Sequence, residues 1–422
     1  MERPRNFPDV VEAALAAGIT TLIGGGVFDN GQLILQRSFE AFEHLPVNLG
    51  LQASGSATSP LPMEESIEAG ACGFKIHEDL GAYGNVIDTC LRIAEQADVS
   101  VALHTDGLQE SADVRGTIEA IDGRAVHAYH IEGAGGGHAP DLLTMAGVDN
   151  IIPSSTTPTL PYSVGTLQEH FAMTVICHLL DLSIPSDAAA LGGRLRQQTM
   201  AAEDVLHDLG AIPVINSDSQ GMGRIGEVIT RTWQLAHKMK AERGAVNPDN
   251  DNDRIRQYIA KYTINPAITH GIADHVGSLE AGKMADVVLW RPAFFGIKPE
   301  VVMKGGFVAW GPMGEGNATV PGSEPTSYGP MFGGIGINPS ALSALFVSSD
   351  SIESGLSRRL RTARGLRPVA GVRTVRKGAM LHNSVSPHIE VDGQAAQVTV
   401  DDVPVTSEAV TQVPLNRLYR LT

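Results

Sequence analysis

The chain has 422 residues, of which 43% are apolar and 18% charged, and its formal net charge is −16. This length can bury a large core, and the acidic balance argues against nucleic acid or an anionic membrane as a partner. The longest apolar runs have only the length of strands, so no membrane span is expected. Three scattered cysteines and a start without a signal-peptide pattern predict a cytoplasmic protein without a disulfide framework.

The first two thirds of the chain alternates short apolar runs with helical patterns. Pro8 opens a helix that stops at Gly18, and 225–244 is a second strong helix candidate. Seven β-branched-rich runs predict buried strands, at 19–26, 45–51, 73–79, 99–106, 124–132, 150–156 and 212–219. Repeated βα units predict a (β/α)8-type TIM barrel over 1–275. Because we count seven strands, the first strand of the eight is missing from the pattern.

The pattern changes after residue 275. Segments 276–290 and 299–311 predict short strands joined by glycine turns, and 311–339 predicts a long loop. The tail 383–405 alternates apolar and polar residues around a turn at Asp392–Gly393. We therefore predict an α/β protein with a smaller β-rich C-terminal domain over 276–422.

Polar side chains stand where the predicted strands end. In a parallel barrel the carboxyl ends of the strands meet at one rim, which is where catalytic groups lie. The residues placed there are Lys75, His77, His104, Asp106, His127, His130 and Asp218. Histidines and carboxylates converging on one rim are the ligands expected for a divalent transition metal. The spacing therefore predicts a metal site.

Lys75 lies in the apolar run GFKIHED, where an ammonium group is costly to desolvate. Burial disfavours the charged form and exposes a reactive neutral amine, which CO2 converts into an anionic carbamate. A bound metal would hold that carbamate as a ligand. The alternative is an ordinary lysine that is paired with Glu78 or Asp79.

The other candidates also have ordinary structural explanations. His104 or His130 alone could be a satisfied core histidine, and Asp218 could cap the helix that follows. The glycine-rich stretch 130–142 would let the backbone approach a small ligand, and it does not follow a phosphate-binding pattern. The helix around 175–181 predicts either a core helix or part of a lid at about 165–200.

Taken together, several stretches closely resemble the alpha (catalytic) subunit of urease, a member of the metal-dependent amidohydrolase superfamily. The resemblance runs over nearly the whole chain from about residue 10. It is carried by GFKIHED, VALHTD, HIEGAGGGHAPD, NIIPSSTTPTLPY, VICHLLD, SDSQGMGRIGEVI and GSLEAGKMADVVLW. It implies hydrolysis of urea to ammonia and carbamate by a site that contains nickel.

The resemblance implies a role for each matching residue. Lys75 would be the carbamylated lysine that bridges two nickel ions. His104 and His130 would bind the first nickel, and Asp218 would bind the second. The resemblance also implies partners, namely the small beta and gamma urease subunits and the accessory proteins that deliver nickel and CO2, in a larger oligomer.

The remaining roles concern substrate. By resemblance, His77 would donate a hydrogen bond to the urea oxygen. His178 would be the general acid on the lid, supported by Arg194. The backbone of two glycines would line the urea pocket, Gly135 and Gly221.

One departure from the family affects the metal site. The family's first strand ends in His-x-His, whereas the matching positions here fall near Glu2 and Pro4, and the first histidine is His44. Asp218 and the carbamate alone would bind a second metal poorly. Three hypotheses stay open: a urease subunit completed by a strand from another chain or a longer start, a mononuclear amidohydrolase acting on another substrate, and a non-catalytic urease-like binding or assembly protein.

Overall fold

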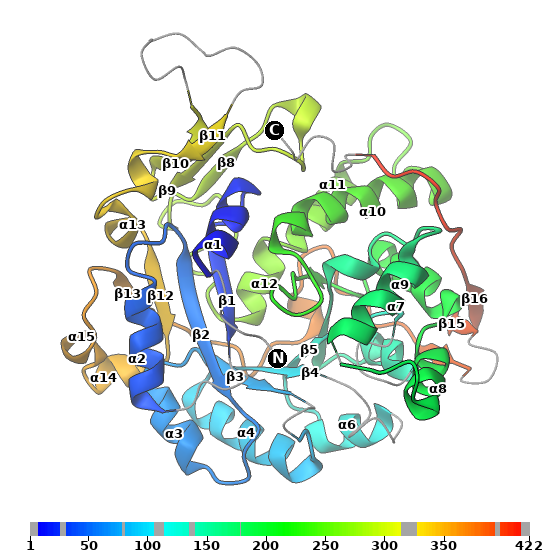
Figure 1. The fold of residues 1–422 in the computed structure, drawn as a ribbon, viewed down its shortest axis with the longest axis horizontal. Helices are drawn as coiled ribbons and strands as arrows, with labels where there is room; N and C mark the ends of the chain where they lie inside the picture. Colours follow the sequence, from blue (N-terminus) through cyan, green and yellow to red (C-terminus); the bar gives the residue numbers. More distant parts are fainter. Residues whose placement is uncertain are drawn as a thin grey trace.

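The computed structural model describes residues 7–25, 31–77, 81–104, 114–134, 140–177, 179–313, 327–392 and 397–414. A parallel sheet forms its centre, ringed by helices (Figure 1). All seven predicted strands form: β1 Thr21–Gly25, β2 Asn48–Ser54, β3 Gly73–Ile76, β4 Ser100–His104, β5 Val126–Tyr129, β6 Ile151–Ser155 and β7 Val214–Ile215. Each pairs in parallel with the next. The predicted barrel fold is thus confirmed.

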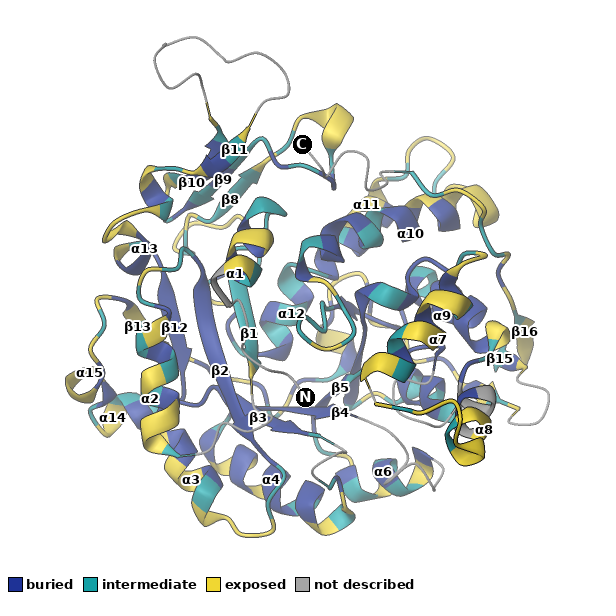
Figure 2. Ribbon diagram, viewed as in Figure 1, coloured by how far each residue is buried: buried dark blue, intermediate teal, exposed yellow. Residues whose placement is uncertain are grey.

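The ring of strands is open between its first and last members. Within the described ranges, β1 pairs only with β2, and β7 pairs only with β6. Figure 2 shows the difference in burial: β2 is buried along its length, whereas β1 is half-buried. This seam between β1 and β7 lies where the sequence predicts a missing strand.

Two strands from late in the chain join the same sheet. β12 (Ala344–Val347) pairs in parallel with the first half of β2, and β13 (Gly365–Pro368) pairs with β12. The second half of β2 pairs with β3 instead. The central sheet therefore takes strands from both sides of residue 275.

The helices cover the outer face of the sheet. They are α1 Phe7–Ala16, α2 Gln32–Ala41, α3 Leu61–Glu68, α4 Gly84–Ala97, α6 Val114–Ile121, α9 Gln197–Leu209, α10 Val228–Arg243, α11 Asn252–Ala260 and α12 Ile264–Thr269. In α4, Val86, Cys90 and Ala94 recur every fourth residue and are buried. That periodicity places one apolar stripe against the strands and leaves the other face in solvent. α4 then ends at Asp98, which has a left-handed backbone.

Two further helices lie within the range predicted as a lid. α7 (Thr166–Cys177) and α8 (Pro185–Arg194) carry many exposed residues, including the large apolar Phe171 and Ile176 of α7. No helix of the described part is both long and apolar enough to cross a bilayer.

The late part of the chain also forms antiparallel sheets, as predicted for a β-rich C-terminal part. One has four strands, β8 Val287–Leu289, β9 Val301–Lys304, β10 Phe307–Pro312 and β11 Tyr328–Pro330. The other has three, β14 Ile389–Val391, β15 Val398–Val400 and β16 Val403–Val405. The buried Lys304 ion-pairs with Asp286 and donates to the Thr20 carbonyl oxygen at 3.2 Å, which attaches the first of these sheets to the barrel.

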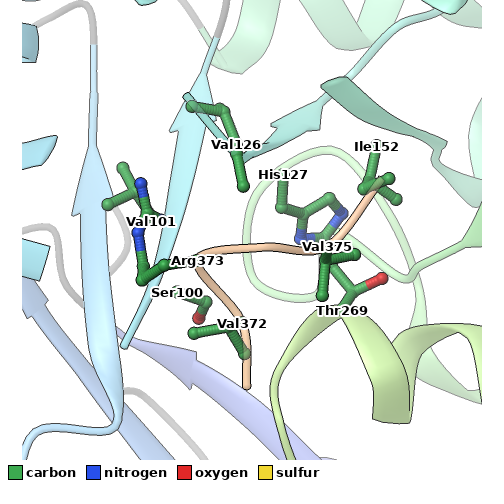
Figure 3. A pocket seen from close by; sticks show the side chains of 10 residues that line it. Ser100, Val101, Val126, His127, Ile152, Thr269, Val372, Arg373 and Val375 are labelled. Atoms are coloured by element: carbon green, nitrogen blue, oxygen red, sulfur yellow. The ribbon is translucent and has the colours of Figure 1, made fainter. Parts of the chain in front are cut away.

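A small hollow lies at the amino-terminal ends of β4, β5 and β6 (Figure 3). Ser100, His127 and Ile152 line it from the strands, and Val372 and Val375 line it from the loop after β13. It has room for little more than one water molecule, which is far too small for a substrate. The chemistry therefore has to be sought at the opposite end of the strands.

Candidate metal centre

Three histidines stack side by side at the carboxyl ends of neighbouring strands. His104 is the last residue of β4, while His77 and His130 directly follow β3 and β5. The ring centroids of His77 and His104 are 4.7 Å apart, and those of His104 and His130 are 4.4 Å apart. Parallel pairing of β3, β4 and β5 brings their ends together, as the sequence predicts.

Asp218 reaches this cluster from the loop after β7. Its Oδ1 lies 3.9 Å from His130 Nε2. Both residues have a left-handed backbone, with φ of 55° at His130 and 47° at Asp218. Residues with a side chain rarely adopt this conformation, and it concentrates at functional sites, where surrounding structure holds it in place.

Lys75 lies beside the histidines inside the barrel. It is 7% exposed, and its register partners are Ser54 on β2 and Ala102 on β4. Its Nζ lies 5.3 Å from the centre of the Tyr129 ring, a cation–π arrangement. Lys75 is also close enough to His130 for its charge to lower the pKa of that imidazole. Lys75 therefore lies within charge range of His130 and beside β4, the strand that ends at His104.

His130 has a carboxylate near each ring nitrogen. Asp218 is near Nε2, and Glu132 Oε1 lies 3.7 Å from Nδ1. Burial lowers the pKa of His130, but the two carboxylates outweigh burial, so the pKa is raised overall. Glu132 is itself fixed by Thr156, whose backbone N–H donates to Oε1 at 2.9 Å and whose hydroxyl also donates to it.

The sequence analysis missed Glu132. A histidine ligand commonly donates its second ring N–H to a carboxylate, which fixes the orientation of the ring. A glutamate two residues after a candidate ligand is the sequence pattern that could have identified Glu132. Glu203, a buried residue of α9 that approaches the same segment, left no comparable signal, because it lies 71 positions beyond Glu132 in the chain.

The predicted substrate-side residues are described only in part. His178 and Gly135 lie outside the described residues, and Arg194 ends α8 with a side chain that is not described. Gly221 is present beside Asp218, and a Cβ at Gly221 would lie 2.7 Å from Asp218 Oδ1. Cys177 Sγ is 4.0 Å from the Gly221 carbonyl oxygen, so the end of α7 reaches this loop.

The donor types fit a divalent transition metal. Two imidazoles, a carboxylate and a lysine that CO2 can convert into a carbamate form a nitrogen and oxygen ligand set. Within the described ranges, no three His, Cys, Asp or Glu side chains converge into a closed metal site. Closing a site around a cation would therefore require His104, His130 and Asp218 to rotate towards one another.

In a parallel (β/α) barrel catalytic groups lie at the carboxyl rim, where this chain places three histidines and a carboxylate, side chains that could hold a metal ion. Residues 6–323 match the model of the amidohydrolase family, and the chain belongs to that family.

A solved structure with a TM-score of 0.50 supports this fold, and two weaker matches are similar enzymes. A dihydropyrimidinase from Brevibacillus agri is 13% identical, with a TM-score of 0.50 over 71% of this chain and 78% of that chain. D-hydantoinase from Thermus sp. is 15% identical, with a TM-score of 0.47 over 70% and 78% of the two chains. L-hydantoinase from Arthrobacter aurescens is 16% identical, with a TM-score of 0.47 over 71% and 79%. At 13% identity, the dihydropyrimidinase shows the fold alone.

Proposed function

We propose that the protein is a metal-dependent amidohydrolase that cleaves a C–N bond of a small linear amide, with urea as the first candidate. The observation that carries the proposal is the cluster of His104, His130 and Asp218 beside Lys75 at the carboxyl rim. Urea is the first candidate because the sequence motifs around these residues resemble those of the urease alpha subunit.

Four residues would hold the metal: His104, His130, Asp218, and Lys75 as its carbamate. Nickel is the ion that the resemblance implies. A bound divalent cation would supply Lewis acidity, which polarises the substrate carbonyl and lowers the pKa of a water molecule. Glu132 would keep the Nδ1 proton of His130 in place, so that Nε2 faces the cation.

The remaining residues would bind substrate and exclude water. His77 lies next to His104 at the rim, and its ring N–H would donate to the substrate carbonyl oxygen. The end of α7 reaches the Asp218 loop through Cys177, so α7 would close over the site. His178, the next residue, would protonate the leaving nitrogen, with Arg194 supporting it.

A second candidate is hydrolysis of another amide by a single cation. Two imidazoles, one carboxylate and the Lys75 carbamate are enough for one cation that keeps an open position for substrate. Two cations would have to share these donors. The observed proximity of one carboxylate to one ligand nitrogen, Asp218 to His130, favours this smaller site.

Metal loading separates these candidates. The purified protein is incubated with Ni²⁺ or Zn²⁺ and bicarbonate, its metal content is measured by mass spectrometry, and ammonia release is assayed with urea and a panel of small amides. Two nickel ions per chain and ammonia from urea support the first candidate. One ion and hydrolysis of another amide support the second. Failure to bind either metal contradicts both and favours a non-catalytic binding protein.

A matched pair of histidine variants tests the location of the site. His130→Ala should remove metal binding, because it deletes the ligand between Asp218 and His104. His237→Ala changes an exposed histidine of α10 and should bind metal as the unchanged protein does. Equal metal content in the two variants would place the metal elsewhere.

Assembly with urease beta and gamma subunits, and metal loading by accessory proteins, are part of the first candidate. Co-expression with a bacterial set of these proteins should then yield a larger complex by size-exclusion chromatography. The seam between β1 and β7 offers a place for a strand from such a partner, because unpaired strand edges accept one. A chain that elutes alone would remove this part of the proposal.

A further inference from the structure

Two side chains of helix α9 hydrogen bond to the Gly133 peptide unit, which lies three residues after His130. The Gly133 N–H donates to Glu203 Oε2 at 2.8 Å, and the Thr199 hydroxyl donates to the Gly133 carbonyl oxygen. Thr199 and Glu203 are one helical turn apart and fully buried, so both side chains point from the same face of α9. We call these three residues the Gly133 clamp.

The backbone of Gly133 also packs directly against the backbone of α9. A Cβ built on Gly133 would lie 2.1 Å from the Thr199 carbonyl oxygen and 2.3 Å from Met200 Cα. Neither atom belongs to a flexible side chain that could move away. Only glycine allows this approach, so the first turn of α9 and the Gly133 peptide must keep their distance and orientation together.

The clamp completes the fixation of the segment that carries His130. Ile131 N–H donates to the Ser154 carbonyl oxygen of β6 at 3.0 Å, and Glu132 is held by Thr156 after β6. Both of these attachments come from the neighbouring barrel strand. The Gly133 clamp adds an attachment from a helix, three residues after His130 with its left-handed φ of 55°.

The same helix is continuous with the predicted lid. Leu195 joins α8 to α9 and packs in one small core with Ala134 and Met200, and Leu167 of α7 packs against that core. Both ends of the lid segment therefore pack against the small core that contains Ala134, the residue after Gly133. A movement of the lid would therefore reach the clamp through Leu195, and the Asp218 loop through Cys177.

The surroundings of Glu203 favour its protonated form. Burial, and then the charge of Glu132, raise the pKa of Glu203 well above its usual range. Its Oε1 also hydrogen bonds with the Thr159 hydroxyl at 2.8 Å. An amide side chain offers the same acceptor and a donor in the same places, so glutamine is the conservative replacement.

We infer that Thr199 and Glu203 are positioning residues, which fix the backbone of the segment that carries His130 and couple the lid to this segment. The expected effect on metal binding rests on the proposed function. The test therefore includes a measurement that needs no metal.

Two variants of Glu203 separate positioning from packing. Glu203→Leu removes the acceptor for the Gly133 N–H, and we expect metal affinity to fall 10- to 100-fold, as for other outer partners of a ligand. Glu203→Gln keeps the acceptor and should stay within about threefold of the unchanged protein. A chelator competition assay measures the affinity. A loss in Glu203→Gln equal to that in Glu203→Leu would overturn the inference.

Asp204→Asn supplies the control for stability. Asp204 is equally buried but accepts from Lys238 and from the Tyr162 N–H, and it has no hydrogen bond to the Gly133 peptide among the described residues. This variant should melt at a lower temperature and keep its metal affinity. If it loses affinity as Glu203→Leu does, general destabilisation explains both results and the positioning role is wrong.

Amide hydrogen exchange of the metal-free protein gives the second measurement. The peptide that contains 130–134 should exchange at least tenfold faster in Glu203→Leu than in Glu203→Gln or Asp204→Asn. Equal exchange in the three variants would overturn the clamp. If the exchange differs as expected but no variant binds metal, the clamp stands and the proposed metal site fails.

Discussion

At the scale of single residues, the carboxylate of Glu132 is one of two that raise the pKa of His130. Glu132 is 3% exposed, and both donors of Thr156 point at its Oε1, so its negative charge is stabilised in place. Although burial works in the opposite direction, hydrogen bonds from His130 and Thr156 and the nearby imidazole charges lower its pKa. The pKa of Glu132 is thus lowered beside His130, whereas burial and the charge of Glu132 raise the pKa of Glu203 behind it.

Replacement by glutamine should therefore affect metal binding more at Glu132 than at Glu203. Glu132→Gln should weaken metal binding about 10- to 100-fold, because a neutral amide supports the ligand imidazole less well than a carboxylate. Metal titration followed by competition with a chelator measures the change. Comparable affinities for Glu132→Gln and the unchanged protein would show that the charge of Glu132 does not act on His130.

The sequence allowed the position of most candidate-site residues at the carboxyl rim to be predicted, because this position follows from local patterns. Lys75, His104 and His130 each stand at the end of an apolar strand, and parallel strands end at one rim. The residues that hold His130 come from the turn after β6 and from α9, far along the chain. Nothing in the spacing of Thr156 or Glu203 indicates this, because their contact with segment 130–133 exists only in the folded chain.

At the scale of elements, α4 and the loop after β13 are joined by one side chain. Asp98, directly after α4, accepts hydrogen bonds from the backbone N–H groups of residues 371–373, with the Val372 N–H at 3.0 Å. Its left-handed φ of 48° aims the carboxylate at this loop. The connection holds the loop that closes the hollow shown in Figure 3.

Removing that carboxylate should destabilise the fold. Asp98→Ala leaves three N–H groups without their acceptor and places alanine in a left-handed conformation, so the free energy of unfolding should fall by about 1–3 kcal/mol. Asp98→Asn tolerates the backbone and keeps one acceptor oxygen, so its loss should be smaller. Urea denaturation of both variants measures this, and identical midpoints for Asp98→Ala and the unchanged protein would contradict it.

The positions of the strands were easier to predict from the sequence than which strands pair with one another. The seven barrel strands were predicted because each is a short apolar run between turn residues. The segment Ala344–Val347 is equally apolar, but its pattern says nothing about which sheet it joins. Its pairing with β2 depends on the point where β2 leaves β3, and that divergence is a property of the folded barrel.

At the scale of the whole molecule, buried imidazoles set the response to acid. His127, His207 and His270 are buried, and burial lowers the pKa of each. For His270 the pKa falls from 6.5 to about 4. Below pH 6.5 the unfolded chain binds a proton that the folded chain does not, so the stability present above pH 6.5 is lost as the pH falls towards 4.

For His270 alone the loss should reach about 3 kcal/mol by pH 4. His270→Gln should flatten this part of the stability profile, because glutamine does not titrate. Thermal or urea unfolding between pH 7 and pH 4 measures the slope for both proteins. Parallel slopes would mean that His270 does not contribute to the acid sensitivity.

The pairing of β12 with β2 also constrains the order of events during synthesis. The Ala344 N–H donates to the Asn48 side chain, which lies 296 positions earlier in the chain. When the first barrel strands leave the ribosome, the residues of β12, which pair with the edge of β2, have not yet been synthesised. Until it does, that edge is open to wrong partners, so the nascent protein should depend on chaperones and should complete its central sheet only late in translation.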